Sequence, residues 1–117
     1  MSEENKAMLL KGNAAISDGN HEGFLGLCTE DTVWTFVNDI VLKGKEAVRE
    51  WMKVTYVHPP KVTVTQLISE GEYLVAIGTV VVKDESGVET ESWYSDVWRL
   101  RDGKFCELQA FVIKKES

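Results

Sequence analysis

The sequence predicts an α+β fold in which three N-terminal helices pack on a curved, mainly antiparallel sheet of four to six strands. Apolar residues recur at helical spacing through much of the first half of the chain, and the period changes to two after residue 61. The second half holds four long strand-like segments separated by tight turns, which is typical of an antiparallel meander. A long sheet wrapped over helices leaves a pocket between the two layers, so a cavity is also expected.

Three helices are expected in the first half. The first covers residues 3–17, the second begins after Asn20, and the third runs from about Lys45 to Tyr56. The apolar stripe expected on the first helix consists of Ala7, Leu10 and Ala14, widened by Leu9 and Ile16. The apolar face expected on the third helix consists of Ala47, Val48, Trp51 and Met52.

The strands follow from the turn signals between them. A short strand at residues 33–37 is expected to turn at Asn38-Asp39 into a small return strand at residues 40–42. The long strands are expected at residues 62–67, 73–83, 88–101 and 104–114. Asp102-Gly103, between the last two, is a strong signal for a hairpin.

Length and composition limit the functions that the chain can have. Its 117 residues are expected to form a single domain over residues 1–117 with one hydrophobic core. The formal net charge of −6 disfavours nucleic acid as a partner, because the phosphate backbone is also negative. The apolar runs are too short for a membrane partner and no signal peptide is recognisable, so a soluble, cytoplasmic protein is expected.

The chain lacks the sequence motifs of common cofactor and metal sites. It has no phosphate-binding loop, dinucleotide fingerprint or zinc-protease motif, and its two histidines stand far apart. Cys28 and Cys106 have no partner at metal-ligand spacing and are interpreted as reduced, buried thiols. The sequence therefore predicts no cofactor and no metal.

Asp96 is the first candidate for a catalytic residue. Side chains alternate across a strand, so Ser92, Tyr94, Asp96, Trp98 and Leu100 share one face. If this face is concave, desolvation raises the pKa of Asp96 and makes it a proton donor or shuttle near neutral pH. Alternatively, the carboxylate accepts a hydrogen bond from a buried indole or hydroxyl and only fixes the pocket, or the opposite register places it outside.

Two further residues are candidates for acid–base chemistry, and a larger set for ligand binding. His58 lies between the third helix and the sheet, and Asp39 lies in a loop, although His58 is more often a helix-end or loop residue and Asp39 is first a turn residue. The residues expected to line the pocket are Trp34, Phe36, Trp51, Tyr56, Tyr94, Trp98, Leu108, Ala110 and Val112. Alternation then turns Glu107 and Gln109 to the opposite face of their strand.

The element order and several short segments resemble the nuclear transport factor 2-like superfamily, and within it SnoaL-like polyketide cyclases and ketosteroid isomerase-like proteins. The main segment is Ser95–Lys104, an acid followed by an aromatic, a basic residue and a turn. Weaker matches are Gly19-Asn20 before the second helix, Thr29-Glu30-Asp31 before the first strand, and Gly44 before the third helix. The resemblance implies a cone-shaped fold, a small apolar molecule in its pocket, and a homodimer formed through the sheet.

The resemblance to ketosteroid isomerase extends to only one of its three catalytic groups. Asp96 falls at the position of that family's protonated aspartic acid. Phe36 falls at the position of its base, and Gly12 at that of its catalytic tyrosine, with Met52 at a supporting tyrosine. The isomerase mechanism as such is therefore not expected, and three alternatives stay open: an acid–base enzyme, a non-catalytic ligand-binding module, and a dimerising scaffold.

Overall fold

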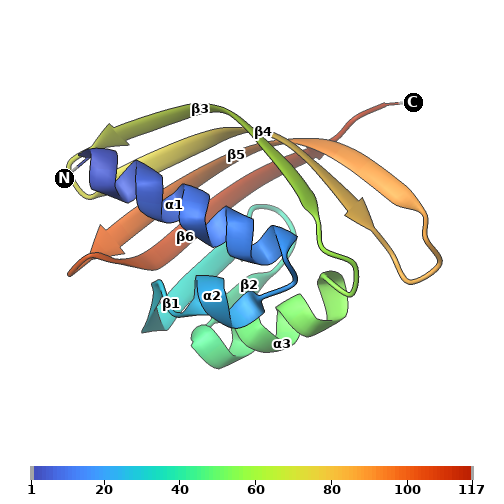
Figure 1. The fold of residues 1–117 in the computed structure, drawn as a ribbon, viewed down its shortest axis with the longest axis horizontal. Coiled ribbons are helices and arrows are strands. Elements are labelled where there is room, and N and C mark those ends of the chain that lie inside the picture. Colours follow the sequence, from blue (N-terminus) through green and yellow to red (C-terminus); the bar gives the residue numbers. More distant parts are fainter. Residues whose placement is uncertain (1, 117) are drawn as a thin grey trace.

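The computed structural model describes residues 2–116 and shows three helices and six strands (Figure 1). In chain order they are α1 (Ser2–Ser17), α2 (His21–Leu25), β1 (Cys28–Phe36), β2 (Val41–Lys43), α3 (Lys45–Thr55), β3 (Lys61–Glu70), β4 (Tyr73–Lys83), β5 (Glu89–Arg101) and β6 (Lys104–Lys114). The α+β class is confirmed. Only α1 and α2 precede the first strand, because the β1–β2 hairpin separates them from α3.

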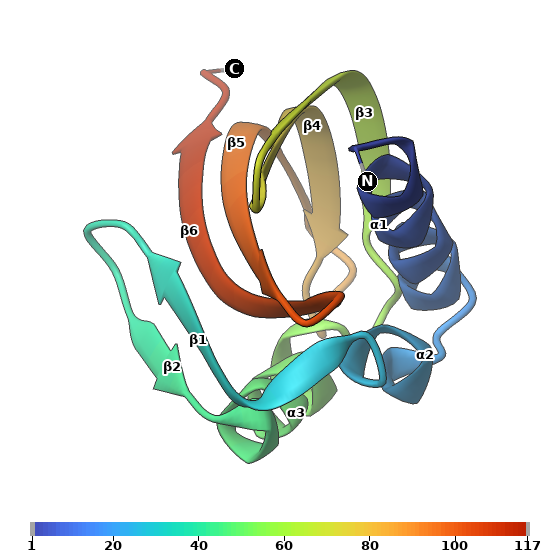
Figure 2. The ribbon, with the colours of Figure 1, turned by 90° about the vertical axis from the view of Figure 1, so that its left-hand side faces the viewer.

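All six strands form one sheet in the order β2-β1-β6-β5-β4-β3. Strands β3 to β6 are the predicted antiparallel meander, whereas β1 pairs in parallel with β6, a long-range contact that the sequence pattern did not predict. Figure 2 shows β3 to β6 bending together, with α1 running beside β3 and with α2 and α3 at one end. The helices therefore cover one face of the sheet.

The buried face of α1 differs from the predicted stripe. Leu9 and Ile16 are buried, but Leu10 is 48% exposed and Ala7 and Ala14 are also exposed. Apolar residues occur on several sides of this helix, so its periodicity did not identify the packed face. The third member of the true face is Gly12, where a Cβ would lie 2.7 Å from the Phe24 ring.

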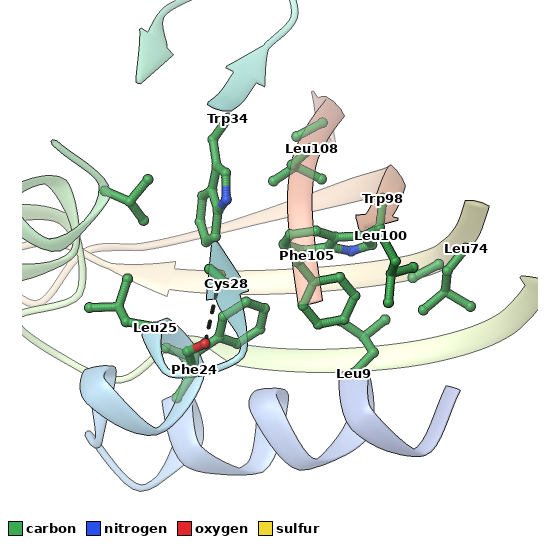
Figure 3. Packing of buried hydrophobic residues seen from close by; sticks show 14 of the residues in the cluster. Leu9, Phe24, Leu25, Cys28, Trp34, Leu74, Trp98, Leu100, Phe105 and Leu108 are labelled. Atoms are coloured by element: carbon green, nitrogen blue, oxygen red, sulfur yellow. Dashed lines mark hydrogen bonds between the residues drawn. The ribbon is translucent and has the colours of Figure 1, made fainter. Parts of the chain in front are cut away.

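Aromatic rings from four elements form the centre of the core (Figure 3). Phe24 of α2 lies 5.5 Å from Trp98 of β5 and 5.9 Å from Phe105 of β6, measured between ring centroids. Trp34 of β1 lies 5.4 Å from Trp98 with its ring nearly perpendicular. Asn20 holds α2 in place by accepting a hydrogen bond from the Gly23 N–H at 3.1 Å.

None of the helices in residues 2–116 has the length and hydropathy needed to cross a bilayer. Cys28 is fully buried on β1, where its thiol donates a hydrogen bond to the Phe24 carbonyl, and burial raises its pKa to about 12. Cys106 is only partly buried on β6. The Cys28 thiol thus behaves as a core group.

Gly78 of β4 is a position where the backbone must approach closely. The register between β3 and β4 shifts between Val64 and Gln66, which is a bulge that bends the sheet. A Cβ on Gly78 would collide with the Thr63 carbonyl group of β3 and would also press on the Tyr94 ring. The glycine therefore permits the curvature of the sheet beside the cavity.

Gly78→Ala is expected to lower the free energy of unfolding by about 1–3 kcal/mol, because the collision involves backbone that cannot simply move aside. Urea denaturation of the variant and the wild type measures this difference. Gly26→Ala is the matched control, because Gly26 has helical dihedral angles and its Cβ would meet only an ordinary contact at 3.4 Å. Equal losses in both variants would contradict this account of Gly78.

Candidate functional site

A cavity of about 110 Å³ lies between the inner face of the sheet and the helices; we call it the inner chamber. Its wall contains side chains from all three helical segments and from every strand except β2. Most of them are apolar, and the polar groups on the wall are Asn13, Trp34, Tyr56, Tyr94, Asp96 and Trp98. Asp96 is the only carboxylic acid among them, and no Lys, Arg or His belongs to the described lining.

Small residues on the neighbouring strands leave the space in front of Asp96. The strand register places Ala76 of β4 directly opposite Asp96 on one side and Ala110 of β6 directly opposite on the other. The next cross-strand row pairs Tyr94 with Gly78. The side chains of Ala76, Ala110 and Gly78 are much smaller than those around them, so they leave space over the sheet next to the Asp96 carboxyl group.

Burial raises the pKa of Asp96 from its ordinary value of 3.8 to about 7. The carboxyl group keeps part of its surface accessible because it borders the chamber, yet apolar side chains surround it. It accepts no hydrogen bond and has no salt-bridge partner among residues 2–116, so nothing offsets the cost of removing its charge from water. Near pH 7 the protonated and ionised forms are similarly populated, which suits a group that gives and takes a proton.

The negative charge of the Asp96 carboxylate acts on two tyrosines, Tyr56 and Tyr94. Burial, and secondly the negative charge of Asp96, raise the pKa of Tyr94 to about 12 and the pKa of Tyr56 well above its ordinary value. Both phenols therefore remain protonated and can act as hydrogen-bond donors. Tyr94 is two residues from Asp96 on the same strand face, a separation of about 6.5–7 Å along β5.

Several buried donors on the chamber wall have no partner in the described part of the chain. They are the Tyr94 hydroxyl and the indole N–H groups of Trp34 and Trp98. The three residues are at most 7% exposed. These donor atoms have almost no accessible surface, so protein atoms enclose them and they do not open into the chamber. A buried donor without an acceptor costs about 1–3 kcal/mol of stability.

A second cavity of about 230 Å³ adjoins the first, and we call it the vestibule. Both cavities share the side chains of Phe36, Tyr56, Val80, Ala110 and Val112. The vestibule alone is lined by Val37, Asp39, Trp51, Thr55 and Val82. Val37, Asp39 and the shared Val112 are exposed, so the vestibule is the outer of the two spaces.

The structure brings most of the expected ligand-binding residues together. Trp34, Phe36, Tyr56, Tyr94, Trp98, Leu108, Ala110 and Val112 line the inner chamber, and Trp51 lines the vestibule. The register expected for Asp96 is confirmed, because Trp93 is 56% exposed whereas Tyr94 and Trp98 are buried. Glu107 and Gln109 alternate with the buried Leu108 and Ala110, as expected.

The two other acid–base candidates do not join Asp96. Asp39 is exposed and borders the vestibule. His58 is partly buried but lines neither cavity, so the structure gives no geometric support to its expected role as a base. Asn13 was missed, although it follows Leu9 by four residues and precedes Ile16 by three, because the predicted stripe on α1 was wrong.

Three positions at which the sequence resemblance places catalytic or supporting groups of ketosteroid isomerase hold residues that cannot perform those roles. Phe36 and Met52 both line the inner chamber with apolar side chains. Gly12 has no room for a tyrosine, because the Phe24 ring fills the space next to it. Within residues 2–116, no three His, Cys, Asp or Glu side chains are grouped so that they could hold a metal ion.

Solved structures of NTF2-like proteins share this fold of a bent sheet over helices. The chain belongs to the SnoaL-like family, because the family's model, described as a SnoaL-like domain, matches residues 11–108. No curated protein matches the sequence. The resemblance to SnoaL-like proteins inferred from the sequence is therefore confirmed.

Solved structures with this fold include enzymes and proteins of unknown function. SalBIII, an epoxide hydrolase/cyclase-like enzyme with a role in pyran ring formation in the polyether salinomycin, is 16% identical over 94% of this chain and 91% of its own, with a TM-score of 0.86. A putative SnoaL-like polyketide cyclase from Jannaschia sp. CCS1 is 17% identical over 95% and 86% of the two chains, with a TM-score of 0.80. An NTF2-like protein of unknown function from Burkholderia pseudomallei K96243 is 18% identical over 92% and 88%, also with a TM-score of 0.80.

The burial of Asp96 predicts how stability depends on pH. The unfolded chain loses this proton near pH 4 and the folded chain near pH 7, so the folded state holds more protons between these values. The free energy of unfolding is therefore expected to fall as pH rises through this window, by up to about 1.4 kcal/mol per pH unit, and to lose this dependence above pH 7. Urea denaturation from pH 4 to 8 measures the difference between the wild type and Asp96→Asn, and parallel curves would contradict the assignment.

Proposed function

We propose that this protein binds a small hydrophobic molecule in its two cavities and that Asp96 moves a proton to or from the bound molecule. The observation that carries this proposal is the Asp96 carboxyl group, which is unpaired, borders a cavity and has its pKa raised to about 7. A group with this pKa supplies both the acid and the conjugate base at neutral pH. The fold and the family relatives support the same class of chemistry.

The proposed step is a transfer of one proton between Asp96 and the substrate. With an enolisable carbonyl compound, the carboxylate removes a proton from the carbon next to the carbonyl group, and the resulting enolate accepts hydrogen bonds on its oxygen. The carboxylic acid then returns that proton to another atom of the substrate, and both charges return to their starting values. Isomerisation, aldol-type cyclisation, dehydration and epoxide opening all use such a transfer, so the proposed enzyme is a cofactor-independent isomerase, cyclase, lyase or hydrolase.

A second candidate function is a binding module without turnover. The observation in its favour is that Asp96 is the only carboxyl group in the described lining of the inner chamber, and Phe36 and Gly12 stand where the resemblance places the base and the catalytic tyrosine. In that case the acid would serve only to orient the ligand. The two candidate functions predict different effects on turnover and on ligand binding when the Asp96 carboxyl group is removed.

Asp96→Asn is expected to lower turnover of a carbonyl substrate by at least about 100-fold, because the amide cannot carry the proton. Its dissociation constant for the same compound is expected to stay within about threefold, since the shape of the chamber is kept. Turnover by absorbance and binding by tryptophan fluorescence measure the two quantities. Asp18→Asn is the control, because Asp18 is exposed after α1 and lines neither cavity, and it should retain wild-type turnover.

Full turnover by Asp96→Asn would exclude the proposed catalytic role. Binding by both proteins with no turnover in the wild type, across ketones, epoxides and hydroxyketones, would favour the binding module. Tyr56→Phe is a second test, because Tyr56 lines both cavities and loss of its hydroxyl should lower turnover while leaving the Asp96 titration in place.

We also propose a homodimer formed through the outer face of the sheet. Three large side chains on this face are exposed: Trp93 by 56%, Phe111 by 42% and Ile113 by 67%. They are cross-strand neighbours, because Trp93 pairs with Ile113 and Phe111 pairs with Ser95 between β5 and β6. A row of this kind on an exposed sheet is typical of an interaction surface.

Ile113→Lys is expected to shift a dimer toward monomer, because the dimer would have to bury the new charge. Sedimentation equilibrium at micromolar concentrations measures the distribution. Val88→Lys is the matched control, since Val88 is similarly exposed, at 60%, but precedes β5 and lies outside this row. A monomeric wild type would contradict the proposed dimer.

A further inference from the structure

We propose that the vestibule is a binding site for a quaternary ammonium group, held by three aromatic rings and by the Asp39 carboxylate at the rim. The rings are those of Phe36, Trp51 and Tyr56, which all line the vestibule, and we call them the aromatic corner. This inference goes beyond the proposed function, because it concerns the outer cavity and needs no proton transfer by Asp96. It follows from the rings, the charges and the openness of the vestibule.

The aromatic corner is built from two elements that lie far apart in the sequence. Phe36 ends β1, and Trp51 and Tyr56 come from the end of α3. The Trp51 ring centroid lies 4.8 Å from that of Phe36 and 5.0 Å from that of Tyr56, and the planes of Trp51 and Tyr56 meet at 71°. Each of the three rings keeps part of its surface accessible, unlike Trp34 and Trp98, which are 4% exposed. The faces of aromatic rings attract cations, so two ring planes at a steep angle can enclose a cation from two sides.

The charge in the vestibule has a single sign. Asp39 is the charged side chain of the described lining, to which no Lys, Arg or His belongs. Asp39 takes part in none of the salt bridges formed among residues 2–116. The turn between β1 and β2 holds its backbone, because the Asp39 N–H donates to the Phe36 carbonyl at 2.9 Å and the Phe36 N–H donates to the Ile40 carbonyl at 2.8 Å. The carboxylate is therefore fixed at the rim and free to pair with a cation from solution.

The sparse polarity of the vestibule favours an alkylated ammonium over a primary one. Besides Asp39, the side-chain oxygens of the lining are the hydroxyls of Thr55 and Tyr56. A primary ammonium has three N–H donors to satisfy, whereas a quaternary ammonium has none and presents methyl groups to side chains such as Val82 and Val112. Because Asp39 and Val112 are exposed, the bound cation stays partly hydrated, and its desolvation costs less than it would in the inner chamber.

The size of the vestibule suits such a group. A dry protein cavity of about 150 Å³ accommodates benzene. The vestibule, at about 230 Å³, can therefore hold a trimethylammonium group with a short substituent. An uncharged ligand of the same shape gains only from the apolar area that it buries, and an anion is repelled by Asp39 and by the ring faces. The lining thus selects its ligand by charge.

Choline and its uncharged carbon analogue, 3,3-dimethylbutanol, test the need for a positive charge by isothermal titration calorimetry. The two compounds have nearly the same shape, so they bury similar areas. Choline is expected to bind the wild type at least about tenfold more tightly, because contact with the rings and pairing with Asp39 add to burial. Added salt should weaken the binding of choline and leave that of the analogue unchanged, since salt screens a pair at the exposed rim.

Two lysine substitutions in the β1–β2 hairpin test the location of the site. Val37→Lys places a cation in the wall of the vestibule and is expected to weaken choline binding by at least about tenfold through charge repulsion. Val41→Lys is the matched control, because Val41 is 53% exposed against 42% for Val37 but lines neither cavity, so its affinity should equal that of the wild type. Both side chains are exposed, so neither change is expected to unfold the protein.

Two further pairs of variants separate the vestibule from the inner chamber and test the rings. Asp39→Asn is expected to weaken choline binding by about threefold to fivefold, and Asp96→Asn by less than about twofold. Trp51→Leu is expected to weaken it by at least about fivefold. Trp93→Leu is the control for the loss of a tryptophan, because Trp93 is 56% exposed on the outer face and lines neither cavity. If Trp51→Leu fails to fold, the lysine pair and the salt dependence decide the question.

The outcomes separate this inference from the proposed function. Equal affinities for choline and its analogue, or an unchanged affinity in Val37→Lys, would overturn the ammonium site. Loss of choline binding in Asp96→Asn but not in Asp39→Asn would place the cation in the inner chamber and overturn the assignment to the vestibule. Neither result bears on proton transfer, which is measured separately by the turnover of the wild type against Asp96→Asn.

Discussion

The carboxyl group of Asp96 has no hydrogen-bond or ion-pair partner among residues 2–116, and the curved sheet shields it from water. The rest of the site depends on this group. Asp96 occupies an inward position on β5, where alternation places it between the rings of Tyr94 and Trp98. Ala76 and Ala110 leave open space beside it without supplying a hydrogen bond. The ionised form of Asp96 is therefore disfavoured. The aromatic core around Phe24, Trp98 and Phe105 must supply the folding free energy that offsets the cost of burying this carboxyl group.

Other charged side chains of the protein, in contrast to Asp96, form ion pairs at the surface. Arg49 bridges Glu22 and Glu46 between α2 and α3, and Arg99 pairs with Glu72. These pairs lie at the surface, where water and salt screen them, so each adds little to stability. None of these basic side chains lines the inner chamber, which leaves the Asp96 carboxylate without a cation to stabilise it. Burial alone thus sets its proton affinity, and a bound apolar ligand would exclude water further.

Local patterns were enough to predict the long strands and the face of Asp96. Alternation in β5 places Asp96 on the same face as the buried Tyr94 and Trp98, so its inward position followed from its neighbours alone. The turn at Asp102-Gly103 predicted the hairpin but not the register shift between Arg99 and Leu100. The parallel pairing of β1 with β6 could not be predicted this way, because its paired residues lie 74 to 77 positions apart in the sequence and leave no local signal. The face of α1 was missed for a related reason. A glycine, Gly12, forms part of it, and only the Phe24 ring from α2 reveals that the face is packed. His58 shows the remaining limit, since sequence position near a pocket does not decide whether a side chain lines it.

Low sequence identity to structures of the same fold shows that the backbone arrangement persists while most side chains differ. SalBIII and this chain share 16% of their residues at a TM-score of 0.86, so the sheet and helices persist while side chains change. Function in such a frame depends on which side chains face the chamber. In this chain Phe24 occupies the space beside Gly12, and Phe36 presents a ring where the isomerase pattern has a carboxylate. Phe24 and Phe36 both present apolar surface to the chamber, which raises the cost of charge on Asp96. The side chains that do not fit the isomerase pattern are therefore part of the environment that raises the pKa of Asp96 to about 7.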